Sequence, residues 1–220
     1  MKKAVILLAT VFAVSLAVEA QPKIRTIKDA YIFGQSCRTA KKQGSVLSLT
    51  TGIAYSLEMA ITETSPRDID ILLFFGKVRG AKVNSFNISA LDNPNVDINW
   101  EKEGGTTPFC KFEGPSSDPN GRMALKNWTI RNATKLQRVE DEIDFNKVTP
   151  EEIAALEVDE YYNVAEIKAG DIIKFETASG KKGLIIIKKI SDDPEVLAKD
   201  PARAGREAYQ RIDLDIKIQR

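Results

Sequence analysis

The chain has 220 residues, with 32 Lys and Arg against 31 Asp and Glu, and it contains no histidine. This even balance argues against a nucleic-acid-binding protein, whose affinity comes mainly from basic residues that neutralise phosphates, and against a polybasic membrane-surface protein. The lack of histidine excludes Ser-His-Asp and Cys-His nucleophilic systems, His-ligated zinc and histidine acid–base catalysis. We also find no G-x-G-x-x-G, P-loop or C-x-x-C motif, so we predict no cofactor.

The first twenty residues have the layout of a secretory signal peptide. Met1-Lys2-Lys3 is followed by an apolar run over residues 4–18, and Val18-Glu19-Ala20 places small residues at the −3 and −1 positions of a cleavage site. The run is shorter than the roughly 20 residues that span a bilayer, although an N-terminal membrane anchor is an alternative. We therefore predict an exported protein, periplasmic or secreted, with no membrane span in the mature chain 21–220.

The N-terminal half of the mature chain predicts three strands and one helix. Residues 24–34 and the alternating segment 45–51 each indicate a strand, the second ending at Gly52. Residues 53–62 carry apolar side chains at helical spacing, and residues 68–75 indicate another strand that is apolar on both faces. Strand, helix and strand in this order are compatible with a βαβ unit or with a bent hairpin.

The middle of the chain is less regular and ends with a clear helix signal. Glycines and prolines over residues 76–119 favour loops with short strands near residues 86–88 and 96–100. Residues 125–139 predict a strand and then a short helix from Thr134. Thr149-Pro150-Glu151-Glu152 is a capping box and predicts a helix to about Val158.

The C-terminal fifty residues predict a β-hairpin, two short helices and a last strand. Residues 171–177 and 183–190 form the hairpin strands, and Gly180 lies in the turn, where it can adopt a positive φ. Because residues 184–187 are apolar on both faces, we expect this strand inside a sheet that is covered on both sides. Short helices follow at Pro194 and Pro201, and the alternation over residues 211–219 indicates a half-exposed strand that pairs with residues 184–190. Together these elements predict a single α+β domain with a mixed or mainly antiparallel sheet and short flanking helices.

Acidic residues supply the candidates for catalysis and for metal binding. Asp68 and Asp70 lie two residues apart at a predicted strand start, so both carboxylates would share one face. Glycoside hydrolysis uses a pair of carboxylates that flank the sugar. The alternative is two solvated acids. Asp92 and Asp97 belong to a segment rich in oxygen ligands of the kind that calcium prefers, but it lacks the EF-hand spacing and also fits an Asx-rich turn.

Two tryptophans and two cysteines complete the candidate residues. Trp100 and Trp128 could form a stacking platform for a sugar, or they could be core residues, since Trp buries a large surface. Cys37 and Cys110 could form one disulfide in an oxidising compartment, or they could be two independent buried thiols.

Several segments resemble a family of secreted bacterial proteins of unknown function. The similar pieces are Gly170-Asp171 with Phe175-x-Thr177, Gly180-Lys181-x-Gly183-Leu184-Ile185, the final Ile-x-Leu-x-Ile strand, Asp68-Ile69-Asp70 and Trp128-x-x-Arg131-Asn132-Ala133-Thr134. They cover about a third of the chain and consist of turn and strand residues. The resemblance implies export and a β-rich fold, and it carries no catalytic motif.

From the sequence we expect a non-catalytic binding or accessory protein outside the cytoplasm, with a glycan or another envelope protein as its partner. The alternative is a carboxylate-dependent hydrolase that acts on carbohydrate. A deep cleft that holds Asp68 and Asp70 would favour the enzyme. An exposed Trp100 or Trp128 on a shallow surface would favour binding.

Overall fold

The computed structural model describes residues 22–33, 44, 46–55, 66–76, 85–93, 131–159, 162–192, 194–199, 201–203 and 210–220. Their strands form two five-stranded sheets. The first sheet has the order β1 (Ile24–Phe33), β10 (Gln210–Gln219), β9 (Lys182–Asp192), β8 (Ile172–Glu176) and β6 (Lys135–Arg138). The second has the order β3 (Ala54–Tyr55), β2 (Val46–Leu47), β4 (Ile71–Gly76), β5 (Ser85–Ala90) and β7 (Asn163–Val164).

The predicted α+β architecture, one sheet with flanking helices, is wrong. Every strand pair in the described part of the chain is antiparallel. The α-helices described there are short, α4 (Pro150–Ala154) with five residues and α5 (Pro194–Lys199) with six. The 3-10 turns are η1 (Pro66–Asp68) and η2 (Pro201–Arg203). A helical layer is not required because the apolar faces of the two sheets cover each other.

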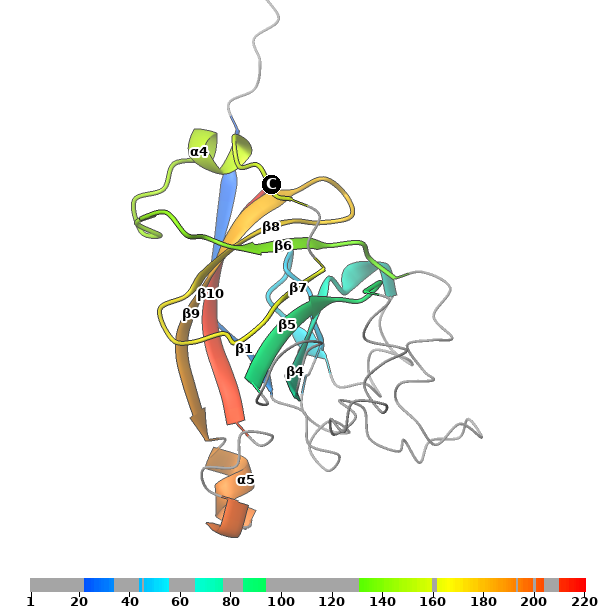
Figure 1. Cartoon of the computed structure of the whole chain (residues 1–220), viewed down its shortest axis with the longest axis vertical. Helices are drawn as coiled ribbons and strands as arrows, with labels where there is room; N and C mark the ends of the chain where they lie inside the picture. Colours follow the sequence, from blue (N-terminus) through cyan, green and yellow to red (C-terminus); the bar gives the residue numbers. More distant parts are fainter. Residues whose placement is uncertain are drawn as a thin grey trace, which may run out of the picture.

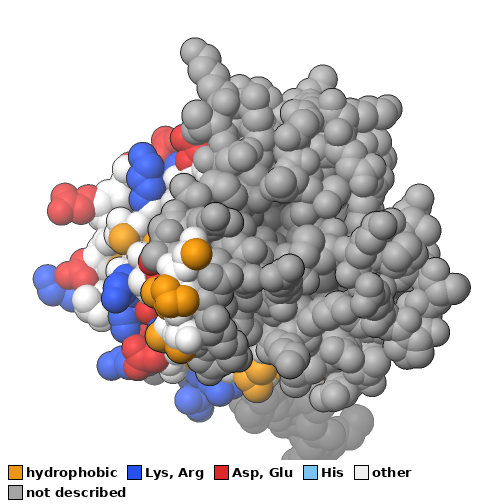
Figure 2. Space-filling model, turned by 90° about the horizontal axis from the view of Figure 1, so that it is seen from below, with side chains coloured by type: hydrophobic (Ala, Val, Ile, Leu, Met, Phe, Trp, Pro, Cys, Tyr) orange, Lys and Arg blue, Asp and Glu red, His pale blue; other side chains and the backbone are white. Residues whose placement is uncertain are grey.

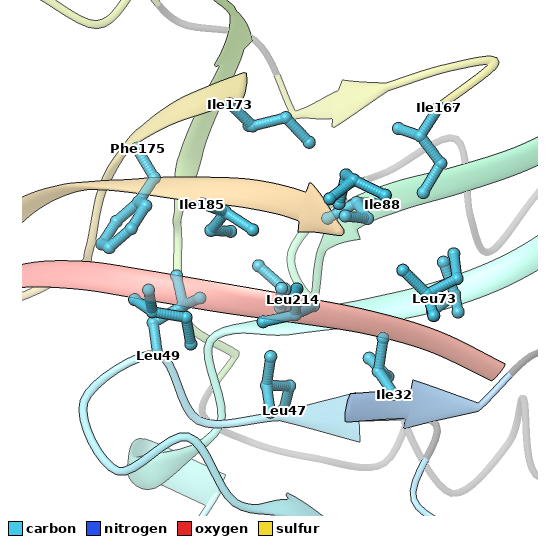
Figure 3. Close-up of a cluster of buried hydrophobic side chains, with 14 of the residues drawn as sticks. Ile32, Leu47, Leu49, Leu73, Ile88, Ile167, Ile173, Phe175, Ile185 and Leu214 are labelled. Carbon is cyan, nitrogen blue, oxygen red and sulfur yellow. The ribbon is translucent and has the colours of Figure 1, made fainter. Parts of the chain in front are cut away.

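The core lies between the two sheets (Figures 1 and 3). Ile173, Ile185 and Leu214 point from the first sheet toward Leu47 and Ile88 of the second, and all five side chains are fully buried. Each large aliphatic side chain removed from water contributes about 1.5–3 kcal/mol, so this layer is the main source of stability for both sheets.

The predicted hairpin of residues 171–190 is confirmed as β8 and β9. The two strands pair antiparallel, and Gly180 in the turn has φ +79°. β9 is the middle strand of the first sheet and is covered on both faces, as its sequence predicts. Ile185 packs in the core between the sheets, whereas Leu184 on the other face packs with Ile153 of α4 and with Phe145.

The region before β4 contains a sharp reversal of the chain. β2 pairs antiparallel with both β3 and β4, which excludes the parallel βαβ alternative and corrects the predicted helix at its start, where residues 54–55 form β3. Gly52 makes this reversal possible, because its φ is +75° and a Cβ there would collide with the side chain of Ile27 in β1.

Two further expectations are corrected by strand pairing. Residues 135–138, expected to begin a helix, form β6 and pair with β8, since Leu136 is fully buried against the core there. The half-exposed strand predicted over residues 211–219 would have Lys217 on its polar face, yet in β10 this residue is only 8% exposed and its Nζ lies 5.3 Å from the centre of the Phe145 ring. The segment around α4 covers this part of the outer face.

In the described part of the chain, no helix is long and apolar enough to cross a membrane. Figure 2 shows the molecule from the end that carries α5 in Figure 1. Basic and acidic side chains are interspersed on the described part of this face, with a few hydrophobic side chains between them.

Candidate functional site

A pocket of about 440 Å³ lies where four connections from the two sheets meet. The connections are the β2–β3 turn, the segment from η1 into β4, the residues before β6 and the β8–β9 turn. We call it the polar pocket; it is lined by Ser48, Thr50, Thr51, Arg67, Asp68, Asp70, Asn132, Ala178, Ser179 and Lys181. Nearly all of these side chains can donate or accept hydrogen bonds.

The β2–β3 turn is held closed by its own backbone and hydroxyl groups. The N–H of Gly52 donates to the carbonyl of Ser48 at 2.8 Å, and the N–H of Ser48 donates to the carbonyl of Ile53 at 3.1 Å. The Ser48 hydroxyl also accepts from the N–H of Thr51 at 3.3 Å. No hydrogen bond to the Thr50 side chain is found among the described residues, so its hydroxyl is available to a ligand in the pocket.

The β8–β9 turn is similarly fixed by Thr177, which is 4% exposed. Its carbonyl accepts from the N–H of Gly180 at 2.8 Å, and its hydroxyl accepts from the N–H of Lys181 at 3.1 Å. Its hydroxyl also lies 3.0 Å from that of Ser179. This network orients the turn that places Ser179 and Lys181 on the pocket wall.

Asp70 joins the β2–β3 turn to the start of β4. Its Oδ2 accepts a hydrogen bond from the N–H of Leu49 at 2.7 Å, and its side chain is buried, with the residue 5% exposed. Burial raises the pKa of Asp70 to about 6, even though the N–H groups of Leu49 and Thr50 and the Asn132 amide favour the charged form. Asp70 therefore holds the pocket wall together and also places a titratable group there.

Asn132 holds the same segment through its backbone carbonyls. Its Nδ2 donates to the carbonyl of Arg67 at 2.8 Å and to the carbonyl of Ile69 at 2.7 Å, and it lies 3.5 Å from Oδ1 of Asp70. The residue is 8% exposed. These bonds satisfy backbone carbonyls of a segment that belongs to no sheet, so they fix the position of Arg67 and Asp68 at the pocket.

The structure brings Asp68 and Asp70 to one pocket, but not on one face of a strand. β4 begins at Ile71, Asp68 belongs to η1, and Asp70 lies between them. The reason is that Asp70 bonds to the β2–β3 turn and Asn132 occupies the carbonyls that a strand would pair. Asp68 is exposed and Asp70 is buried, so the two carboxylates differ in access to a ligand.

A second pocket, of about 400 Å³, adjoins the polar pocket. We call it the basic pocket; it is lined by Arg25, Thr50, Lys181, Ile218, Gln219 and Arg220. Thr50 and Lys181 line both pockets. Nη1 of Arg25 donates to the carbonyl of Thr50 at 3.1 Å, which fixes the guanidinium beside the shared wall.

Of the predicted metal residues, Asp92 lies in the turn after β5. Burial raises its pKa, while its own backbone N–H and Arg131 lower it, and its buried Oδ1 has no hydrogen-bond partner among the described residues. The described residues contain no group of three or more Asp, Glu, Cys or His side chains that could hold a metal ion. Calcium binding by Asp92 and Asp97 stays a prediction, because Asp97 lies outside the described residues.

The other predicted site residues also lie outside the described part of the chain. These are Trp100, Trp128, Cys37 and Cys110. The sugar-stacking platform and the disulfide therefore stay predictions.

Sequence reasoning missed most of the polar pocket. Asn132, Arg67 and Lys181 carry no catalytic motif and lie far apart in sequence, although all three line one pocket and Asn132 bonds to Arg67, sixty-five positions away. One signal was present: Asn132, Asp70 and Lys181 all belong to the segments on which the family resemblance is based.

Comparisons with known proteins add a distant structural likeness. No protein-family model matches the chain, and no curated protein gives a significant match. Among solved structures, the chain is similar to a DUF4466 family protein from Parabacteroides merdae, with 14% sequence identity and a TM-score of 0.43. The match covers 89% of this chain and 53% of that chain, so this chain spans about half the length of that protein. That neighbour is thus a bacterial protein from a family of unknown function.

Proposed function

We propose that this chain is an exported, non-catalytic binding or accessory protein that holds a glycan in the polar pocket. The observation that carries the proposal is the lining of that pocket, in which hydroxyl, amide and charged side chains converge from both sheets. A saccharide presents many hydroxyl groups, each of which donates and accepts, and a wall of this composition can pair with them.

The pocket also offers carbon surface and rigidity. The methyl groups of Thr50 and Thr51 and the aliphatic stem of Lys181 can pack against the C–H groups of a sugar ring. The two turns that supply these residues are fixed by internal hydrogen bonds. The pocket wall is therefore already ordered before a ligand binds. Binding then costs little conformational entropy, which favours affinity.

The buried state of Asp70 favours binding over hydrolysis. A catalytic acid must reach the glycosidic oxygen, but Oδ2 of Asp70 already accepts from the N–H of Leu49 at 2.7 Å. Asp70 instead acts as a brace for the pocket wall. The hydrolase alternative retains one supporting observation: the pKa of Asp70, about 6, suits a general acid at neutral pH.

Binding is tested with the mature protein, residues 21–220, on a glycan array and with soluble peptidoglycan fragments. Ala178 is exposed on the pocket wall, so Ala178→Trp fills the pocket without disturbing a buried contact. Ala169 is exposed in the turn before β8 and lines no described pocket, so Ala169→Trp is the matched control.

We expect at least one glycan to bind the unsubstituted protein and Ala169→Trp with equal affinity. The same glycan should bind Ala178→Trp at least tenfold more weakly. A blank array, or binding that Ala178→Trp leaves intact, would overturn the proposal. If the protein hydrolysed the bound glycan and Asp70→Asn abolished this activity, the hydrolase alternative would replace the binding proposal.

Export rests on the layout of residues 1–20 alone. Expression of the full chain in a bacterial host, followed by fractionation and N-terminal sequencing, tests it directly. We expect a periplasmic or secreted product that begins at Gln21. An intact Met1 in the cytoplasmic fraction would contradict it.

A further inference from the structure

We infer that the ligand is an acidic saccharide that extends from the polar pocket into the basic pocket, with its anionic group at Lys181. This inference rests on the proposed glycan-binding function and adds the chemical class of the glycan. Two observations support it: the pockets share two lining residues, and Lys181 and Arg25 form no ion pair with a carboxylate among the described residues.

The two pockets form one continuous surface. Thr50 and Lys181 contribute to both, and Arg25 of the basic pocket bonds to the backbone of Thr50. The pockets have volumes of about 440 and 400 Å³, each within the range of small-molecule sites. A ligand longer than one sugar unit can therefore occupy both and must pass Lys181 between them.

The cations at this junction differ from several others in the described part of the chain, which lie in ion pairs with carboxylates. These pairs are Arg138 with Asp171, Arg211 with Asp213, Lys188 with Asp29 and Lys135 with Glu176. Within the same described residues, neither Lys181 nor Arg25 forms an ion pair with a carboxylate. Lys181 lines both pockets and Arg25 lines the basic pocket, so a bound anion could pair with either cation.

The carboxylates nearby do not cancel this charge. Asp70 is 5% exposed and its Oδ2 bonds to the Leu49 N–H, so it is a poor partner for a ligand or for Lys181. Asp68 is exposed and also lines the polar pocket, but among the described residues it forms no ion pair with Lys181. The shared wall thus combines an ammonium, a guanidinium and the Thr50 hydroxyl, which together suit a carboxylate or a phosphate on a sugar.

The test compares acidic and neutral forms of one saccharide by calorimetry. The probes are tetragalacturonate, its fully methyl-esterified form, which has the same length without the charge, and mannose 6-phosphate for the phosphate source. The variants are Lys181→Gln, Lys181→Arg and Lys168→Gln. Lys168 is exposed in the turn before β8 and lines neither pocket, so Lys168→Gln is the charge-matched control.

We expect an acidic probe to bind at least tenfold more tightly than the methyl ester, and to weaken as salt is raised. Lys181→Gln should remove most of this preference, Lys181→Arg should keep it, and Lys168→Gln should have no effect. Circular dichroism and the melting temperature check that each variant is folded.

Three results would overturn the inference: equal affinity for the acid and its ester, an unchanged preference in Lys181→Gln, or no binding of either acidic probe. If Ala178→Trp still abolishes binding of a neutral glycan in those cases, the proposed function stands without this inference. If no glycan of any kind binds, both fail.

Discussion

Oδ2 of Asp70 accepts a 2.7 Å hydrogen bond from the backbone N–H of Leu49, and this contact ties the start of β4 to the β2–β3 turn. The carboxyl group is buried, and desolvation is the largest cause of its raised pKa. The group that braces the pocket wall therefore also titrates within the range where many proteins are stable. Its charge state should be visible in the stability of the fold.

Stability should fall as pH rises through the pKa of Asp70. The pKa is about 6 in the folded chain against an ordinary value of 3.8, so between these values the folded state binds more protons than the unfolded state. The stability contributed by the protonated form is fully present below about pH 4 and is lost as pH rises through 6, a change of about 2–3 kcal/mol.

The measurement is urea denaturation of the parent and Asp70→Asn from pH 4 to 8. Because the amide that this substitution introduces does not titrate, the parent should lose stability relative to the variant as pH rises through this window. A difference that stays constant with pH would show that Asp70 titrates normally.

Removing the Asn132 amide should loosen the wall of the polar pocket. Asn132→Ala leaves the carbonyls of Arg67 and Ile69 without their donor, which should lower the free energy of unfolding by about 1–3 kcal/mol. Asn132→Asp has nearly the same shape but sets a carboxylate against these carbonyls and near Asp70, so it should cost more at pH 7 than at pH 4.

Denaturant midpoints measure both effects, and Asn146→Ala, at an exposed position, is the control. If Asn132→Ala had the same free energy of unfolding as the unsubstituted protein, water would replace the hydrogen bonds of the amide without loss of stability. Equal stability of Asn132→Asp at the two pH values would show that its added charge does not interact with the wall.

The predictable parts of the fold are those determined by interactions between residues a few positions apart in the sequence. The β8–β9 hairpin depends on Gly180 in the turn and on a run of apolar residues, and the α4 cap depends on Thr149 and Glu152, three residues apart. In both cases the interacting groups lie within a few positions of each other. Local patterns therefore contain the information that these elements need.

The parts that could not be predicted depend on distant partners. Residues 135–138 form β6 because β8, nearly forty residues further along, offers a strand edge. Lys217 is buried under the Phe145 ring, and its Nζ donates to the backbone carbonyl of Asn146 at 3.2 Å. The apolar face of one sheet can be covered by helices or by a second sheet, and periodicity alone does not distinguish these two solutions.

The same reasoning applies to the candidate site. The sequence singled out Asp68 and Asp70 because two acids stood close together, and both line the polar pocket. It could not show that Asp70 bonds to a backbone amide twenty-one residues earlier, nor that Lys181 meets Thr50 at a shared wall. The first contact needs the pairing of β2 with β4 in the second sheet, and the shared wall needs both sheets.

Loss of the α4 cap should destabilise the cover on the outer face of the first sheet. The Thr149 hydroxyl accepts from the N–H of Glu152 at 3.2 Å, and the Glu152 carboxylate accepts from the N–H of Thr149 at 2.7 Å. Thr149→Ala removes the first bond and should cost about 1 kcal/mol, whereas Thr149→Ser should retain most of it. Thermal denaturation of the three proteins tests this. A Ser variant as unstable as the Ala variant would show that the lost methyl group, rather than the hydroxyl, is responsible.

Alanine at Gly183 should be far more damaging than alanine at Gly180, although both glycines belong to the same hairpin. A Cβ at Gly183 would collide with the backbone carbonyl of Lys217 and with the ring of Phe175, in the middle strand of the first sheet. Overpacking against backbone costs about 1–3 kcal/mol or more, because neither β10 nor the buried ring can move freely.

A Cβ at Gly180 would meet nothing within 4 Å, and only the positive φ of +79° opposes it. That strain costs about 1 kcal/mol and stays in the turn. Denaturant midpoints of Gly183→Ala and Gly180→Ala compare the two directly. If Gly180→Ala proved the more destabilising, the close approach of β9 to β10 at Gly183 would not be the constraint that we infer.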